Sequence, residues 1–228
     1  CFVTGNPMGS VYSGEIQCKA LGMDVDIYDE KGNSKELIKG ELVCKSPFPS
    51  KPIYFYNDLN NKKYFNAYFA KYKNVWHHGD FASTTKMSGY IIYGRSDSTL
   101  NSGGVRIGTS ELYRVVENIE NIEECLATEL KLKNDTEVIL FIKIRKNIEF
   151  NNEFMIKIKN EIKRLLSPKH IPTKIISMKD IPKTKSGKIV EITIKKIINN
   201  EKIDNLTSLS NPESLQEYYK FAKELNQG

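Results

Sequence analysis

The sequence reads Pro182-Lys183-Thr184-Lys185-Ser186-Gly187-Lys188 directly before an apolar-periodic segment, residues 189–198. Pro182 fixes one backbone angle and Ser186-Gly187 permits a tight turn, so the pattern predicts a turn that presents Lys188 at the start of a helix. A lysine held on such a turn can reach a phosphate, and its compact charge suits phosphoryl or adenylyl transfer. The competing interpretation is a solvated basic loop. The other motifs of the chain are needed to choose between a phosphate-binding turn and such a loop.

Around this stretch, residues 97–228 have the pattern of an α+β domain. Apolar periodicity and turn residues predict helices at 109–119, 154–166, 189–198 and 211–225, and strands at 123–130, 138–144 and 174–178. The last helix is expected to begin at Asn211-Pro212, because proline is favoured at the first helical position.

Residues 1–96 look different, with short β-like runs separated by turn residues. We expect strands at 15–19, 23–28, 40–44 and 90–93, the last ended by Gly94, and a short helical turn at 67–72. This pattern predicts an antiparallel β unit. The sequence therefore indicates two domains, residues 1–96 and 97–228.

Composition narrows the classes of function. The 228 residues are 39% hydrophobic, enough for a packed core, and no apolar run approaches the ~20 residues that a membrane-spanning helix needs. The net charge of +6 could attract a nucleotide, coenzyme A or nucleic acid. The aromatic residues cluster at 54–93, away from the basic region, so no nucleic-acid surface is expected. The four cysteines lie far apart without metal-ligand spacing, which predicts no metal site, no disulfide framework and a reducing cytoplasm.

Three glycine-containing motifs supply candidate ligand-binding residues: Gly79-Asp80, Gly94-Arg95-Ser96-Asp97 and Gly103-Gly104-Val105-Arg106. Paired glycines let the backbone approach a ligand closely, and the two arginines offer forked donors for phosphate or carboxylate oxygens. A carboxylate after a glycine turn can accept both hydroxyls of a ribose. Each motif alone also fits an ordinary surface turn. The neighbouring His77 and His78 are expected to be packing or surface residues, because successive strand residues point to opposite faces.

The order and spacing of these motifs and the Pro182–Lys188 stretch resemble the adenylate-forming superfamily of acyl-CoA synthetases, nonribosomal peptide adenylation domains and luciferases, over essentially the whole chain. Leu100-Asn101 and residues 106–111 resemble its acetyl-CoA synthetase branch. Residues 14–23, 45–50 and 210–215 are most similar to the acetoacetate–CoA ligases. The resemblance implies an α+β fold, with the end of a large AMP-binding domain in residues 1–96 and a small mobile C-terminal domain in residues 97–228.

The same resemblance implies an ATP-dependent ligase that joins acetoacetate to coenzyme A in two steps through an acyl-adenylate. Lys188 matches the catalytic lysine that stabilises charge on the α-phosphate, and Asp97 matches the hinge on which the small domain rotates. The nucleotide-binding residues implied are Asp80, Arg95 and Arg106; the coenzyme A contacts implied are Gly104 and either Lys163 or Arg164. Mg²⁺ is implied as well, with its ligands outside this chain.

Departures from the family pattern set the limits of the resemblance. Ser98 stands where a second aspartate is common, and Val105 where histidine or lysine is usual. The chain has no phosphate loop, no T-E or T-D motif and no acyl-pocket segment; because the family has these before the position of Cys1, we expect the last third of an enzyme that is inactive without its missing N-terminal part. Two alternatives stay open: a ligase for acetate or propionate, and a non-catalytic nucleotide-binding remnant.

Overall fold

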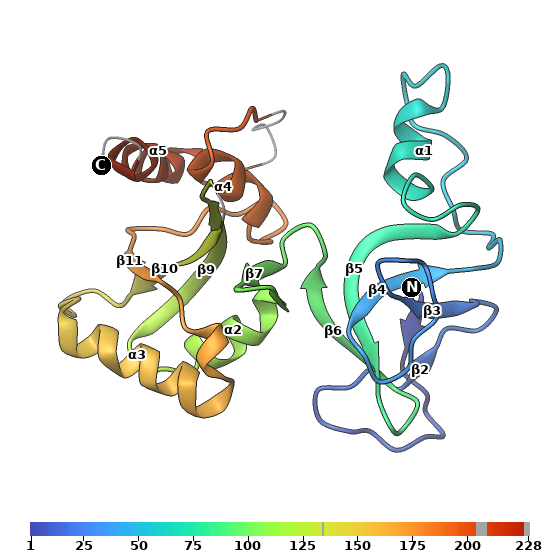
Figure 1. Ribbon diagram of the computed structural model, residues 1–228, viewed down its shortest axis with the longest axis horizontal. Helices are drawn as coiled ribbons and strands as arrows, with labels where there is room; N and C mark the ends of the chain where they lie inside the picture. The colour runs from blue at the N-terminus through green and yellow to red at the C-terminus, as the bar shows by residue number, and fades with distance from the viewer. Residues whose placement is uncertain (134, 204–208, 226–228) are drawn as a thin grey trace. The chain divides into compact units, whose positions relative to one another are not determined.

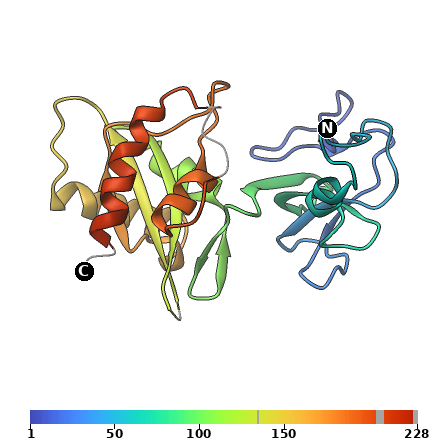
Figure 2. The same cartoon turned by 90° about the horizontal axis from the view of Figure 1, so that it is seen from above.

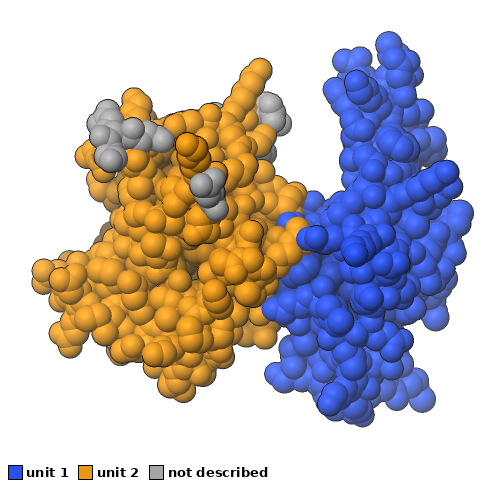
Figure 3. Space-filling model, viewed as in Figure 1, with its two compact units in different colours: residues 1–96 blue, residues 97–228 orange. Residues whose placement is uncertain are grey.

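The computed structural model describes residues 1–133, 135–203 and 209–225. The chain divides into two compact units, Cys1–Ser96 and Asp97–Gly228, which are coloured separately in Figure 3. Each unit has its own buried core.

The first unit is built on a four-stranded antiparallel sheet in the order β3-β4-β5-β6 (Figure 1). Its strands are β3 (Val25–Tyr28), β4 (Gly40–Cys44), β5 (Trp76–Thr84) and β6 (Tyr90–Arg95). The remaining elements are the short strands β1 (Val3–Thr4) and β2 (Cys18–Lys19), which pair with each other, and helix α1 (Lys62–Tyr68). The predicted antiparallel β unit is confirmed.

Alternating apolar side chains on the sheet form the main core of this unit. Val25, Ile27 and Leu42 are fully or almost fully buried, together with Ala82 and Tyr90 from the other two strands. All five residues of β4 are buried because strands flank it on both sides. This complete burial makes the one charged residue of β4, Glu41, conspicuous.

Two local expectations for this unit are wrong, and one strand of the sheet was not predicted. The helix lies at α1 rather than at 67–72, because the Asp58 carboxylate accepts hydrogen bonds from the backbone N–H groups of Lys63 and Tyr64 and so fixes an earlier first turn. The sequence patterns also do not predict β5 as a strand. Gly79 and Gly94 do not end regular structure but lie inside β5 and β6 at positive φ, where the strand registers shift as in β-bulges.

The second unit is a three-stranded sheet with helices on both faces (Figure 2). Strand β10 (Thr136–Ile144) lies in the centre, antiparallel to β9 (Ile122–Lys131) and parallel to β11 (Lys174–Ser177). The helices are α2 (Thr109–Val116), α3 (Asn152–Leu165), α4 (Glu191–Ile198) and α5 (Leu215–Leu225), with short 3₁₀ turns at Pro168–His170 and Pro212–Ser214.

Strand β10 separates two hydrophobic layers because its side chains alternate between the faces of the sheet. Leu140 and Ile142 pack with residues of α2 and α3, among them Ile158. Ile139 and Phe141 pack on the opposite face with residues of α4 and α5. The predicted α+β pattern is confirmed for this unit, with helix ends displaced by up to three residues; the last helix begins as a 3₁₀ turn at Pro212.

A β-hairpin that the sequence patterns do not predict as strands lies at the start of this unit. It consists of β7 (Leu100–Ser102) and β8 (Val105–Ile107), joined by Gly103-Gly104. Both glycines have positive φ, 54° and 80°, which is the requirement of a two-residue type I′ turn. The turn itself therefore favours glycine at both positions, independently of any ligand that the backbone approaches there.

Candidate functional site

In the first unit, Asp80 and Arg95 lie directly opposite each other on β5 and β6. An Arg95 Nη1 atom lies 3.5 Å from an Asp80 carboxylate oxygen and also donates a hydrogen bond to the backbone oxygen of His78. The second Asp80 oxygen lies 3.2 Å from His78 Nδ1. A carboxylate and a guanidinium are thus presented side by side, a combination that suits ribose hydroxyls and a phosphate.

Gly79 permits this arrangement. Its φ of +83° is readily adopted only by glycine, and a Cβ at this position would meet Arg95 Nη2 at 2.7 Å. The backbone of β6 is tied to the same point, since Ser96 N–H donates to the Gly79 oxygen at 2.8 Å. The sequence reasoning identified Gly79 as a turn; its actual role is to let a guanidinium lie across a strand.

A charged cluster around Glu41, in the same sheet, was not predicted from the sequence. The Glu41 carboxylate is 2% exposed and accepts hydrogen bonds from Lys71 and, at 3.2 Å, pairs with His77 Nε2. Burial alone would raise its pKa, but hydrogen bonds from His77, Lys71 and Ser96 hold the pKa of Glu41 at about 2. The signal was a glutamate inside an otherwise apolar strand. His77 and His78 are partly buried, as expected for packing residues, and burial lowers the pKa of His78.

In the second unit, Lys188 lies at the end of a tight hairpin. Thr184 N–H donates to the Lys188 oxygen and Gly187 N–H to the Thr184 oxygen, both at 2.8 Å, and Gly187 has a φ of +82°. Lys183 and Ile189 pair as an antiparallel bridge at the base of the hairpin. The Lys188 side chain is exposed and has no ion pair among the described residues, so its ammonium group is available to an anion.

Two partly buried polar contacts connect the hairpin and the helix after it to the rest of the unit. Lys183 forms an ion pair with Glu124 of β9. Directly after the hairpin, Glu191 accepts a hydrogen bond of 2.6 Å from the Tyr113 hydroxyl of α2. Burial, followed by the Glu191 charge, raises the pKa of Tyr113 well above its usual range. The segments on either side of the lysine turn are therefore each tied by a side chain to β9 or to α2.

The other predicted residues of this unit lie on the β7–β8 hairpin and on α3. Arg106 is exposed on β8, and a Cβ on Gly104 would meet no atom within 4 Å, so the backbone there is open to approach. A Cβ on Gly103 would meet the Lys169 ammonium nitrogen at 2.8 Å. Lys169 is a neighbouring cation that no motif indicated.

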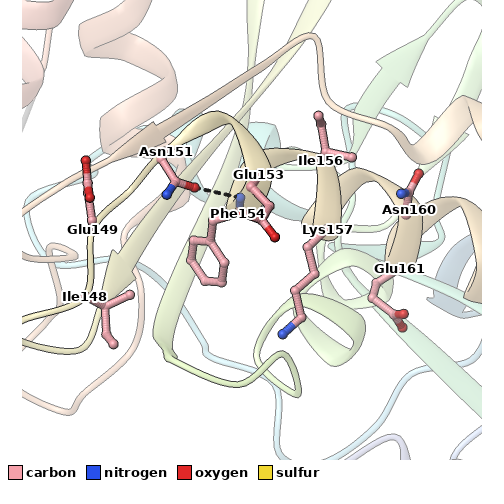
Figure 4. Close-up of a pocket in the computed structure, with 9 residues that line it drawn as sticks. All are labelled: Ile148, Glu149, Asn151, Glu153, Phe154, Ile156, Lys157, Asn160 and Glu161. Carbon is pink, nitrogen blue, oxygen red and sulfur yellow. Dashed lines mark hydrogen bonds between the residues drawn. The ribbon is translucent and has the colours of Figure 1, made fainter.

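Lys163 and Arg164 occupy the last turn of α3 and differ in their surroundings. Arg164 pairs with Glu161 at 2.6 Å, whereas Lys163 is exposed and has no ion pair in the described part of the chain. Of the two adjacent residues, Lys163 is the available cation. A groove of about 620 Å³ runs along this helix from Ile148, before its first turn, to Glu161, and its lining contains none of the predicted residues (Figure 4).

Asp97 is the first residue of the second unit. Its backbone oxygen accepts a hydrogen bond of 3.2 Å from Lys195 of α4, and Lys195 also pairs with Glu129 at 2.8 Å. Among the described residues, no three or more His, Cys, Asp or Glu side chains are grouped to hold a metal ion. Within the same residues, no helix is long and apolar enough to cross a membrane.

Comparison with known proteins gives consistent matches, although no protein-family model matches the chain. The acetoacetyl-coenzyme A synthetase of Rhizobium meliloti (strain 1021) is 46% identical over 215 residues, covering 94% of this chain and 33% of the relative. The structure of acetoacetyl-CoA synthetase from Streptomyces lividans superposes with a TM-score of 0.92 at 33% identity, covering 99% of this chain and 34% of that one. An anthranilate CoA ligase, AuaEII, shares the fold with a TM-score of 0.74 at 17% identity, covering 87% of this chain and 37% of that one. The chain thus spans about a third of the length of the proteins it matches.

Proposed function

We propose that this chain forms part of an ATP-dependent acid–CoA ligase of the acetoacetyl-CoA synthetase family, because it is similar to these proteins over the third of their length that it spans. The reaction is acetoacetate plus ATP giving acetoacetyl-adenylate and pyrophosphate, followed by thioester formation with coenzyme A and release of AMP. The observation that carries this proposal is the joint agreement of sequence and fold, 46% identity with one relative and a TM-score of 0.92 with another.

The role that we propose for the first unit is binding of the nucleotide. Asp80 accepts the ribose hydroxyls, and Arg95 beside it donates to ribose and phosphate oxygens. This division of work is supported by the position of the two groups, 3.5 Å apart on neighbouring strands and held in place by Gly79. Binding costs little reorganisation when both groups are already oriented.

The role that we propose for the second unit is charge stabilisation and coenzyme A binding. Lys188 faces the negative charge that grows on the α-phosphate as the carboxylate attacks it. Asp97, at the boundary between the units, is the hinge about which the second unit turns between the half-reactions. Gly104 and Arg106 then approach coenzyme A and nucleotide, and Lys163, rather than the paired Arg164, binds a coenzyme A phosphate.

Magnesium ions commonly bind to nucleoside triphosphates and neutralise part of the phosphate charge. The described residues offer no cluster of three metal ligands, so we assign no residue of this chain to that ion. We also infer a cytoplasmic location, which the four free cysteines support because thiols stay reduced there.

The test is acetoacetate-dependent exchange between ATP and pyrophosphate in the intact protein. We expect Lys188→Ala to lower this adenylation step by about 10²- to 10³-fold, the usual effect of removing one preorganised charge-stabilising donor, while thioester formation from preformed acetoacetyl-adenylate persists. Lys185→Ala is the matched control, because Lys185 lies in the same turn and is exposed without an ion pair in the described chain.

The outcomes separate the alternatives. Equal loss of both half-reactions in Lys188→Ala contradicts the role given to Lys188. Exchange with acetate or propionate but not with acetoacetate favours a ligase for another short acid. Nucleotide binding without exchange for any acid leaves a non-catalytic nucleotide-binding protein.

A further inference from the structure

The hairpin that carries Lys188 has a second neighbour besides its own return arm. Thr184 forms an antiparallel bridge with Leu209, and Ser210 N–H donates to the Lys183 oxygen at 2.9 Å. Since Lys183 also pairs with Ile189, the outgoing arm lies between two strand-like segments. Residues 209–211 therefore form a brace for the hairpin, and the position of Lys188 depends on them as well as on the local turn.

Asn211 makes the closest side-chain contacts of this brace. Its Oδ1 accepts a hydrogen bond of 2.9 Å from Lys183 N–H, and its Nδ2 donates to the Ile181 oxygen at 3.0 Å and to Asp180 Oδ2 at 2.5 Å. Asp180 is in turn paired with Lys143 of β10 at 2.9 Å. An asparagine side chain has one acceptor and two donors, so every polar group of Asn211 is used.

The brace is itself fixed to the core of the unit. Ser214 donates a hydrogen bond of 2.7 Å to the Asn211 oxygen and closes the 3₁₀ turn. The following helix α5 buries Leu215 and Tyr218 against the sheet, with exposed fractions of 3% and 0%. The Tyr218 hydroxyl donates to the Asp180 oxygen at 3.2 Å. Asn211 is therefore presented by a packed element rather than by a loose tail.

We infer that Asn211 is a positioning residue for Lys188: it holds the outgoing arm of the hairpin so that the ammonium group meets the α-phosphate. This inference rests on the proposed function and adds to it a residue 23 positions beyond the lysine that acts without touching substrate. Catalytic groups need placement within about 0.5 Å, and a misplacement of about 1 Å can cost on the order of 10²-fold in rate. Only the step that uses Lys188 should respond.

The informative variant in the intact protein is Asn211→Asp. It keeps the size and the acceptor but loses both donors, and it sets a carboxylate beside Asp180 and the Ile181 oxygen. We expect acetoacetate-dependent pyrophosphate exchange to fall about 10- to 100-fold, with thioester formation from preformed acetoacetyl-adenylate within about twofold of wild type. Glu213→Gln is the matched control, because Glu213 is exposed in the same segment and has no hydrogen bond to the hairpin.

Two further measurements distinguish positioning from a general loss of stability. In a Lys188→Ala background, Asn211→Asp should not lower the rate of pyrophosphate exchange any further, because a residue that acts through Lys188 has no effect once that side chain is gone. Ile158→Val lowers stability from the opposite face of the sheet and should spare the adenylation step at matched stability. An additive loss in the double variant, equal loss of both half-reactions, or an equal effect of Ile158→Val overturns the inference.

Amide hydrogen exchange separates the failure of this inference from failure of the proposed function. Asn211→Ala removes the acceptor as well as the donors and should speed exchange of the Lys183 amide, which donates to Asn211 Oδ1 in the native structure; unchanged exchange in Asn211→Ala overturns the brace. If wild-type protein shows no acetoacetate-dependent exchange of pyrophosphate, the proposed function fails, and with it the catalytic part of the inference. Faster Lys183 exchange in the variant would then still establish the brace.

Discussion

Replacing Tyr113 by phenylalanine removes one hydroxyl that serves two groups in the second unit. The hydroxyl donates to Glu191 Oε1 at 2.6 Å and accepts the N–H of Ala127 at 3.1 Å. Ala127 is 1% exposed and lies on β9, an edge strand of its sheet, so the hydroxyl takes the place of a missing neighbouring strand. Phenylalanine keeps the ring packing and leaves both partners unpaired.

The expected cost follows from the two partners. A buried N–H left without an acceptor costs about 1–3 kcal/mol, and a hydrogen bond to a charged group contributes about 1.5–3 kcal/mol. Glu191 is only partly buried, so a water molecule can replace part of the hydrogen bond that its carboxylate loses. We therefore expect Tyr113→Phe to lower the free energy of unfolding of the second unit by about 2–4 kcal/mol.

The measurement is native-state amide exchange of β9 and β10, which reports the opening free energy of this unit separately from that of the first. Tyr219→Phe is the control, because Tyr219 on α5 is 40% exposed, and we expect it to stay within about 0.5 kcal/mol of wild type. If Tyr113→Phe lowers the opening free energy as little as Tyr219→Phe does, water hydrogen-bonds to both Glu191 and the Ala127 N–H, and the reasoning from burial is wrong.

Three other outcomes follow from named groups. The pKa of Glu41 is about 2 in the folded chain against an ordinary 4.5, so its stabilisation is fully present above pH 4.5 and is lost as pH falls toward 2. A pKa difference of this size, at ~1.4 kcal/mol per pH unit, corresponds to about 3 kcal/mol of stability at neutral pH. The unfolding free energies of wild type and Glu41→Gln, measured as a function of pH, should therefore converge at low pH. Burial raises the pKa of the Cys125 thiol well above its usual range, so a maleimide at pH 8 should label exposed Cys1 but leave Cys125 unmodified until the unit unfolds. In the intact protein, Lys163→Ala should raise KM for coenzyme A about tenfold through loss of a charged contact, and Arg164→Ala should do so less, which steady-state kinetics can compare.

Much of the fold follows from local rules that operate within a few residues. The strand and helix periods of the second unit identify its sheet and helices because side-chain alternation and helical spacing are set by the backbone. The tight turn before Lys188 follows from Ser186-Gly187, since glycine is free to take the positive φ that the structure shows. The resemblance to acid–CoA ligases was likewise carried by short contiguous motifs.

The geometry of the candidate site could not be predicted in the same way. Asp80 lies opposite Arg95 only because β5 and β6 pair in a particular register. The sequence patterns predict a turn at Gly79 and a strand end at Gly94, where the structure has bulges inside the strands. Glu41 accepts a hydrogen bond from Lys71, 30 residues away in the sequence, and Asn211 accepts one from Lys183, 28 residues away. Such contacts depend on how distant segments pack, and the free energy that selects one packing is summed over the whole core. A motif can therefore name Lys188, but the support that holds it in place arises when α5 packs against the sheet.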